Sequence, residues 1–369
     1  MGGRVLVSLV MAAVISGCAP GGGIVARPTP TEAAPGFTET VIQSGLVVPW
    51  DVAVAGDGRM FVTERPGTIS VFESTAPMAK RIATTQVPGV RAMGEAGLLG
   101  LALDPDFATT RELYVCASRV EQGEWRNQVL RYRLSGTALA LDATVLRAGI
   151  IATGIHDTCR IRFGPDGKLW VATGDAGQPA HAQDATSLNG KVLRLNPDGS
   201  IPSDNPTIKG QSAPGAVYAL GLRNPGGLAF HPKTGIAFVV DAGDQMQDEV
   251  DLVTAGANFG WPTVLGPNGS GRGFTDPTWS SGASSLAVAG AAFLTDGWGS
   301  WNNSLLVATL KEQDLRRFIV DDGHATAREI LLDQRYGRLR GVTVAPDGSI
   351  LVTTSNGSGD RILRLAPAP

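Results

Sequence analysis

Three groups of side chains in this sequence could carry out chemistry. His156 lies just before a predicted strand, and an imidazole can take up a proton near neutral pH. Arg223 and Asn224 form a polar pair inside the otherwise apolar segment GLRNPGG. Arg338 and Arg340 are two residues apart, so both point to the same side of an extended segment. Together these side chains could bind an anion and remove a proton from a substrate.

Two further sets of polar residues each allow more than one interpretation. Acidic residues crowd one segment, which could attract a cation or form a solvated loop: Asp241, Asp244, Asp248, Glu249 and Asp251. Among the other histidines, His231 falls in a proline-containing turn and His324 in a polar loop, so we expect both at the surface. His181 follows Asp175 in a loop, where it could line a cleft.

A repeated strand–turn–strand unit must position these residues. Each copy has a short apolar strand, a turn with Pro, Asp or Gly, and a second strand rich in Val, Leu and Thr. The copies are 50–63, 98–118, 159–173, 227–240 and 341–354, with a weaker one in 286–309. Six copies, about fifty to sixty residues apart, predict an all-β fold: a six-bladed β-propeller of four-stranded antiparallel blades. Loops of such a fold converge on its axis, so distant polar residues can share one pocket.

Several segments resemble the soluble quinoprotein glucose dehydrogenase, aldose sugar dehydrogenase and sorbosone dehydrogenase family. The resemblance runs from about Val47 to Leu365 and follows the family's order: PWDVAVAGDGRMFVTERPG, GEAGLLGLALDPDF, HDTCRIRFGPDGKLWVATGD, SLNGKVLRLNPDGSIPSDNP, GLRNPGG, DEVDLVTAGANFGWP and GRLRGVTVAPDG. It implies a propeller enzyme that uses pyrroloquinoline quinone (PQQ) and calcium to oxidise an aldose at C1 to its lactone. Similarity of fold is less specific for activity than for architecture.

The resemblance also implies roles for individual residues. His156 would be the general base that removes the C1 hydroxyl proton, and Asp175 would orient it. Arg223 would lie beside the quinone carbonyl that receives the hydride, where a planar and permanently charged donor suits a developing oxyanion. The other cofactor-binding positions match Asn224, Lys311, Arg338 and Arg340. The alternative is that Arg338 and Arg340 have no part in binding and only protect a strand edge.

The sequence departs from the family at several of these positions. Glu95 stands near the substrate where many members have glutamine, and Gly226 replaces a glutamine that helps to hold the quinone. Gly243 and Asp244 occupy the positions whose backbone carbonyls bind calcium, with the aspartate in place of proline. Cys159 replaces a glycine close to the histidine. We therefore expect altered cofactor affinity or lost activity.

These departures leave other functions open. One is a non-catalytic propeller lipoprotein that binds carbohydrate or protein through the same cleft. Another is lactone hydrolysis by a calcium propeller, which needs side-chain oxygens from several blades around one ion, and no such set is identifiable in the sequence. For a dehydrogenase, the electrons must pass to an external acceptor, because the sequence has no CxxCH haem-attachment motif.

The N-terminus predicts export. Arg4 precedes an apolar stretch that is too short to span a bilayer and that ends in the lipobox-like ISGC. We expect a signal peptide over 1–17, lipid attachment at Cys18, a flexible linker over 18–37 and the propeller domain over 38–369. The protein would then be anchored on the outer face of the bacterial cell membrane or in the periplasm. An ordinary signal peptide that happens to contain a cysteine is the alternative.

The net charge and the cysteine content limit which binding partners and metal sites the sequence predicts. The formal net charge of −3 over 369 residues gives no basic surface for nucleic acid, so we expect none as a partner. Cys116 and Cys159 remain after export, and they could form a disulfide or stay as two buried thiols. No His or Cys cluster has the spacing of a zinc site. The expected partners are an aldose, an electron acceptor and, through Cys18, a membrane.

Overall fold

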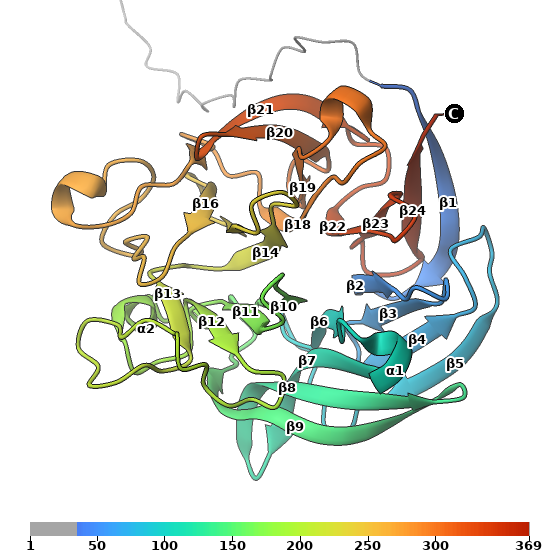
Figure 1. Ribbon diagram of the computed structural model, residues 1–369, viewed down its shortest axis with the longest axis horizontal. Coiled ribbons are helices and arrows are strands. Elements are labelled where there is room, and N and C mark those ends of the chain that lie inside the picture. The colour runs from blue at the N-terminus through green and yellow to red at the C-terminus, as the bar shows by residue number, and fades with distance from the viewer. Residues whose placement is uncertain (1–34, 369) are drawn as a thin grey trace, which may run out of the picture.

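The computed structural model describes residues 35–368, which form six four-stranded antiparallel sheets arranged as a ring (Figure 1). The all-β, six-bladed propeller predicted from the repeats is thereby confirmed. The predicted signal peptide, Cys18 and most of the predicted linker lie outside the described residues. Among the described residues, no helix is long and apolar enough to cross a membrane.

The blades follow one another in chain order. Blade 1 contains β2 (Pro49–Val54), β3 (Met60–Glu64), β4 (Thr68–Phe72) and β5 (Arg81–Gln86). Blade 2 contains β6 (Leu98–Leu103), β7 (Glu112–Glu121), β8 (Glu124–Ser135) and β9 (Ala138–Ile151). Blade 3 contains β10 (Cys159–Phe163), β11 (Leu169–Thr173), β12 (Lys191–Leu195) and β13 (Val217–Leu220).

The second half of the chain repeats this arrangement. Blade 4 contains β14 (Pro225–Phe230), β15 (Ala237–Asp241), β16 (Glu249–Val253) and β17 (Trp279–Ser280). Blade 5 contains β18 (Val288–Phe293), β19 (Leu305–Thr309), β20 (Leu315–Asp321) and β21 (His324–Leu331). Blade 6 contains β22 (Leu339–Val344), β23 (Ile350–Thr354), β24 (Asp360–Pro367) and β1 (Phe37–Leu46). Short helices occur in the connections: α1 (Phe107–Thr110), α2 (Ala180–Gln183) and the 3₁₀ turns Ser270–Arg272 and Gly299–Trp301.

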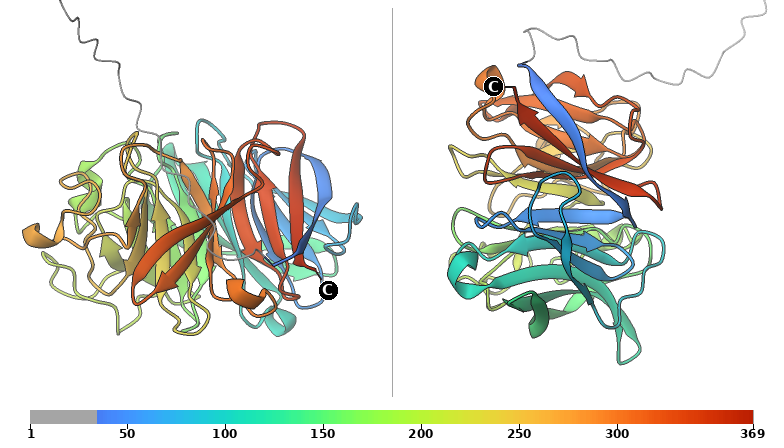
Figure 2. Two further views of the ribbon diagram at one scale, coloured as in Figure 1. Left: turned by 90° about the horizontal axis from the view of Figure 1, so that it is seen from above. Right: turned by 90° about the vertical axis from the view of Figure 1, so that its right-hand side faces the viewer.

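The ring is closed by the two ends of the domain. The first strand, β1, pairs antiparallel with β24, with Phe37 opposite Pro367 and Leu46 opposite Asp360. The N-terminal strand thus completes the C-terminal blade as its outermost strand, and this pairing closes the ring. The side views in Figure 2 show the resulting thick disc.

Apolar side chains fill the spaces between neighbouring blades. In five of the six blades the second strand is buried along its whole length because it is covered on both faces, as in LWVAT of β11 and ILVTT of β23. Between blades 2 and 3, for example, Leu99, Tyr114, Ile161 and Leu193 belong to one buried cluster. The core is therefore a ring of inter-blade layers rather than one central mass.

A disulfide also joins two blades. Cys116 of β7 and Cys159 of β10 are bonded, with their Cα atoms 6.0 Å apart. Of the two alternatives that the sequence left open, the structure therefore has the disulfide. It fixes the start of β10 to blade 2, three residues after His156.

The innermost strands β2, β6, β10, β14, β18 and β22 contact one another in sequence around the axis. In the described part of the chain, all of them except β10 have a register irregularity within their first four residues. Trp50, Gly226, Ala289 and Arg340 lie at four of these irregularities. Bulges redirect side chains and are common beside active sites. The same end of the ring is therefore where a site is expected.

Candidate active site

One cavity of about 240 Å³ lies at the end of the ring where the inner strands begin. This volume is close to the lower end of the range that small-molecule sites usually have. Every blade contributes residues to its wall. The lining includes Trp50, Glu95, His156, Thr158, Arg223, Asn224, Gly226, Gly243, Ala289, Leu310, Arg338 and Arg340. Half of these residues come from the loops that lead into the inner strands, as expected for a propeller, and most of the others lie in the inner strands themselves.

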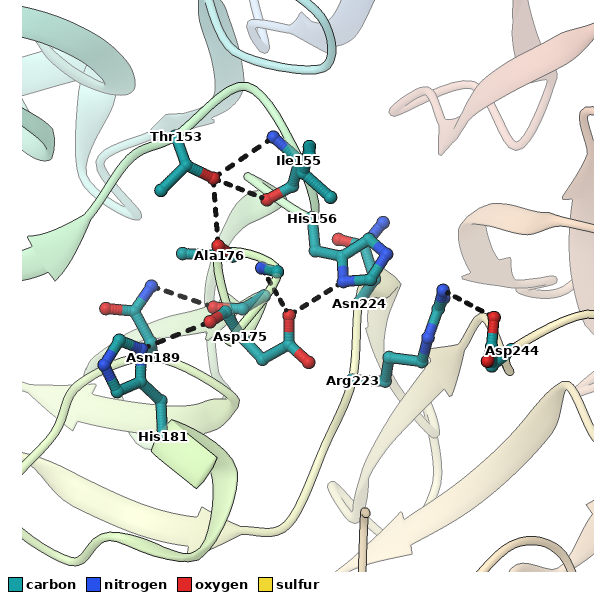
Figure 3. Close-up of polar contacts among 12 residues, drawn as sticks. Thr153, Ile155, His156, Asp175, Ala176, His181, Asn189, Arg223, Asn224 and Asp244 are labelled. Atoms are coloured by element: carbon teal, nitrogen blue, oxygen red, sulfur yellow. Dashed lines mark hydrogen bonds and ion pairs between the residues drawn. The ribbon is translucent and has the colours of Figure 1, made fainter. Parts of the chain in front are cut away.

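The central titratable pair in the cavity wall is His156 with Asp175. The imidazole Nδ1 lies 2.7 Å from Oδ1 of Asp175, which is fully buried, while His156 keeps 16% of its side chain exposed (Figure 3). Oδ1 also accepts the backbone N–H of Gly177 at 2.7 Å. The carboxyl group of Asp175 is therefore held by the backbone as well as by the imidazole. His156 itself lines the cavity.

The backbone around this pair is held in a strained conformation. His156 has φ of +50° and Ala176, next to Asp175, has φ of +59°, in the left-handed region that non-glycine residues rarely adopt. Gly174 permits the close approach of the two segments, because a Cβ atom there would lie 1.9 Å from the carbonyl oxygen of His156. Positions with such strain cluster at functional sites. This strained backbone carries the imidazole of His156 at the cavity wall.

Arg223 and Asn224 project from the loop between β13 and β14. Both of their backbone N–H groups donate to the carboxyl group of Asp241, at 2.7 and 2.6 Å. Burial raises the pKa of Asp241 to about 7, although these two N–H groups oppose the shift. The guanidinium of Arg223 donates to the carbonyl of Ala242 at 2.9 Å, and its Nε is buried without a hydrogen-bond partner. One donor is thus left for a ligand.

Further cations surround the cavity. Arg338 and Arg340 both line it, and the Nε of Arg340 donates to Ser355 at 3.0 Å. Burial lowers the pKa of Arg340 to about 9, which still leaves the guanidinium charged at neutral pH. Its cationic carbon lies 5.9 Å from the ring centre of Trp50. With Arg223, three guanidinium groups face one small volume, an arrangement suited to a ligand with several carboxylates.

The sequence model of the family described as "Glucose / Sorbosone dehydrogenase" matches residues 46–364. The chain belongs to the glucose/sorbosone dehydrogenase family. Its relatives include the aldose sugar dehydrogenase YliI of Escherichia coli K12, 32% identical with 89% of this chain and 92% of the relative covered. Quinoprotein glucose dehydrogenase B of Acinetobacter calcoaceticus is 28% identical, with 88% and 86% covered.

A solved structure in this family is also similar. The PQQ-bound form of aldose sugar dehydrogenase from Streptomyces coelicolor is 33% identical, with a TM-score of 0.75 and with 90% of this chain and 99% of that chain covered. The family resemblance seen in the sequence motifs is thereby confirmed. The similarity extends over nearly the whole propeller, not over a single motif.

Some sequence-predicted site residues lie elsewhere in this family member. Lys311 is exposed, and its neighbour Leu310 lines the cavity instead. Gly243 lines the cavity, whereas the carboxylate of Asp244 is 56% exposed and lies 3.4 Å from a terminal nitrogen of Arg223. His181 contacts the backbone oxygen of Asp175 at 3.2 Å and is not among the cavity-lining residues. The cation set of the cavity is therefore smaller than the sequence predicted.

The acidic segment after β15 is only partly a solvated loop. Asp241, Asp248 and Asp251 are buried, so that interpretation is wrong for these three residues. Asp248 accepts backbone N–H groups from Gly243, Leu286 and Val288 at 2.7–3.2 Å. Within residues 35–368, no group of three or more His, Cys, Asp or Glu side chains is placed to hold a metal ion.

The structure explains two of the departures from the family pattern. A Cβ atom on Gly226 would lie 2.7 Å from Cα of Ala289, so the backbone of blade 5 occupies the space of a larger residue. Cys159 takes part in the disulfide described above. The carboxylate of Glu95 accepts the side-chain N–H of Asn224 at 2.9 Å, which ties blades 2 and 4 together at the mouth.

Several residues of the site were missed by sequence reasoning. Trp50 forms a wall of the cavity, and the guanidinium of Arg160 lies 3.9 Å from its ring centre. Arg160 is itself fully buried and pairs with Asp51 at 2.8 Å. Trp261 donates its indole N–H to Asp175 at 2.8 Å. Both tryptophans stand in family-like motifs, PWDV and FGWP, but only the fold brings Trp50 to the cavity wall and Trp261 to Asp175.

Proposed function

We propose that this protein oxidises an aldose at C1 to its lactone, with PQQ as cofactor. The observation that carries the proposal is the juxtaposition, in one cavity, of the His156–Asp175 pair and the guanidinium groups of Arg223, Arg338 and Arg340. A proton acceptor and an anion-binding wall in one small volume suit a sugar hydroxyl lying against a polyanionic cofactor. Membership of a family with a PQQ-bound relative supports the choice of cofactor.

The residues present fit PQQ. The buried, unpartnered Nε of Arg223 and the half-buried guanidinium of Arg340 need anionic or acceptor groups nearby. Asn224, at the same wall, offers a further amide, and the three carboxylates of PQQ match these donors. When bound, the quinone accepts the hydride that leaves C1 of the sugar. Arg223 would bind the reducible end of the cofactor and Arg338 with Arg340 its carboxylates.

The chain's own residues would handle the proton. Gly177 donates to the same carboxyl oxygen that faces His156, so Nδ1 of the imidazole is assigned as a donor to Asp175. The other ring nitrogen, Nε2, is then the free acceptor on the cavity side. It would take the proton of the C1 hydroxyl, and Asp175 would stabilise the imidazolium formed. Release of that proton to solvent would return His156 to its starting state.

We further propose a calcium ion beside the cofactor, held on the protein side by backbone oxygens near Gly243. Gly243 lines the cavity, and its N–H is fixed by Asp248, so its peptide group has a defined orientation. The side chain of Asp244 points toward Arg223 and solvent, so it would contribute at most its backbone. Adding and chelating calcium during PQQ titration tests this: PQQ affinity should fall at least several-fold on chelation.

Export with a lipid anchor at Cys18 is also a proposal, supported by the N-terminal sequence. The strand register of blade 6 places Phe37 and Leu46 at opposite ends of the blade. The end with Leu46 is the end where β22 begins, next to the cavity, and the end with Phe37 and Pro367 is the far one. A tether would therefore join the ring on the face away from the cavity mouth. Cys18→Ser should release the protein from membranes, detected by fractionation, without changing its turnover.

The test of the activity compares two histidines that contact the same aspartate. The full chain is reconstituted with PQQ and calcium, and dye reduction is followed with several aldoses. His156→Gln should lower kcat by about 10²- to 10⁴-fold while PQQ still binds. His181→Gln, which alters a residue outside the cavity wall, should stay within a few-fold of wild type. No PQQ-dependent absorbance change and no turnover, with the Escherichia coli relative active alongside, would refute the proposal.

A further inference from the structure

The second oxygen of Asp175 has a partner that comes from another blade. Its Oδ2 accepts the indole N–H of Trp261 at 2.8 Å, while Oδ1 faces His156 and Gly177. Trp261 lies in the long connection 254–278 between β16 and β17 of blade 4, whereas Asp175 follows β11 of blade 3. The carboxyl group beside the proposed base is therefore held jointly by two blades.

The connection that carries Trp261 is fixed where it reaches blade 3. Gln183, at the end of α2, donates to the carbonyl oxygen of Trp261 at 2.7 Å and exchanges hydrogen bonds with the Asn258 side chain at 2.9 and 2.8 Å. The backbone N–H of Trp261 donates to Gly221 at 3.1 Å. The indole is thus anchored on both sides of its own peptide unit, and its N–H has a fixed direction.

The same indole also lies beside Arg223, one of the residues that line the cavity. The guanidinium carbon of Arg223 lies 5.5 Å from the centre of the Trp261 ring. The backbone of Arg223 meets the pair as well, because its carbonyl accepts the N–H of Asp175 at 2.8 Å. Trp261 therefore contacts two residues of the site through different parts of its ring: its N–H bonds to Asp175, the partner of the proposed base, and its face lies near Arg223.

We propose that Trp261 is a positioning residue, which acts on His156 through Asp175. The terminal torsion of an aspartate is broad, so a carboxyl group with donors on one oxygen only can rotate. The indole N–H on Oδ2 removes that freedom and keeps Oδ1 on Nδ1 of the imidazole. This fixes the Nδ1–H tautomer and leaves Nε2 as the proton acceptor. The inference rests on the proposed role of His156 as the base.

The test removes the N–H and keeps the ring. Trp261→Phe retains an aromatic face for Arg223 but cannot donate to Asp175. The matched control is Trp298→Phe, because Trp298 is buried in the connection between β18 and β19 of blade 5 and donates its indole N–H to the carbonyl of Gly348 in blade 6 at the same 2.8 Å. We expect kcat to fall about 10- to 100-fold in Trp261→Phe, the range for a lost hydrogen bond to a charged group. KM and the Kd for PQQ should stay within two-fold.

A readout that needs no turnover comes from the cofactor-free protein. Nitrogen-15 NMR of the imidazole should show His156 as one Nδ1–H tautomer in wild type and in Trp298→Phe, and as a mixture of tautomers in Trp261→Phe. In wild type alone, the Trp261 indole N–H resonance should shift in the same pH step as the His156 ring, since both groups bond to one carboxyl. This second measurement decides the matter even where the variant does not fold.

Three results would overturn the proposal. One is an unchanged tautomer in Trp261→Phe with kcat equal to that of the Trp298 control. Another is a change in PQQ affinity alone, which would assign the tryptophan to the cofactor through Arg223. The third is an indole resonance that ignores the protonation of His156. Absence of sugar oxidation in the wild type would refute the proposed function, but the NMR comparison would still decide whether Trp261 orders this pair.

Discussion

The disulfide between Cys116 and Cys159 should carry a large share of the stability of the ring. It closes a chain segment with a sequence separation of 43 residues. Loop-closure entropy for a segment of that length is worth about 4 kcal/mol at 25 °C. With an unfolding entropy of about 2.1 cal/mol/K per residue, the described propeller of roughly 330 residues changes its Tm by about 1 °C for each 0.7 kcal/mol. Loss of the bond should therefore lower Tm by about 6 °C.

Two forms of the protein separate the cross-link from the packing of its sulfur atoms. Reduced wild type keeps both sulfurs in the core, whereas the double variant Cys116→Ala/Cys159→Ala also loses their volume. Calorimetry should give a fall of about 6 °C for the first and a somewhat larger fall for the second, and reductant should not change the Tm of the double variant. A reduced wild type that melts within 1 °C of the oxidised protein would refute the chain-entropy reasoning.

Other consequences concern buried charge and close packing. Burial raises the pKa of Asp251 well above its ordinary value, so wild type should lose stability relative to Asp251→Asn as the pH rises above the ordinary pKa of a carboxyl group, by up to about 1.4 kcal/mol per pH unit. Parallel pH profiles of unfolding free energy would contradict this. Gly226→Ala should cost about 1–3 kcal/mol, because the new Cβ meets the Ala289 backbone, while Gly56→Ala, with open space around it, should cost less than 1 kcal/mol in the same denaturant assay. Asp51→Asn removes the buried partner of two arginines and should cost about 3–5 kcal/mol; an unchanged denaturation midpoint would show that the pair is not needed.

The propeller could be predicted from the sequence because its information is local and repeated. Each strand–turn–strand copy carries its own apolar periodicity and turn residues, so six weak signals add up to one strong one. The same logic placed His156, Arg223 and Arg338 near each other, since all three precede inner strands that converge on the axis. Lys311 is assigned from the family resemblance alone: it follows a second strand, and the turn after β19 brings Leu310 rather than the lysine to the cavity.

The contacts that support the site could not be predicted, because they depend on how blades pack against each other. Trp261 reaches Asp175 only through an irregular connection that leaves blade 4 and runs along blade 3. Arg160 and Asp51 meet across two inner strands separated in sequence by a whole blade. Sequence periodicity cannot predict such contacts, because an irregular loop has no repeating pattern and residues that pair between blades have no fixed spacing in the chain.

At the cavity end of the ring, the effect of a substitution depends on the backbone of the neighbouring inner strand. At Gly226 the missing side chain leaves no hole, because Ala289 of the next inner strand occupies that space; at Gly290, a Cβ atom would lie 2.5 Å from the carbonyl oxygen of Arg340. Both glycines sit at or beside the register irregularities that begin their strands. These irregularities therefore have two effects: they let neighbouring inner strands approach closely, and they turn residues such as Arg340 toward the cavity. The space that a side chain at Gly226 would need is thus filled by the backbone of the adjacent blade, so the shape of the cavity wall depends on pairs of neighbouring inner strands.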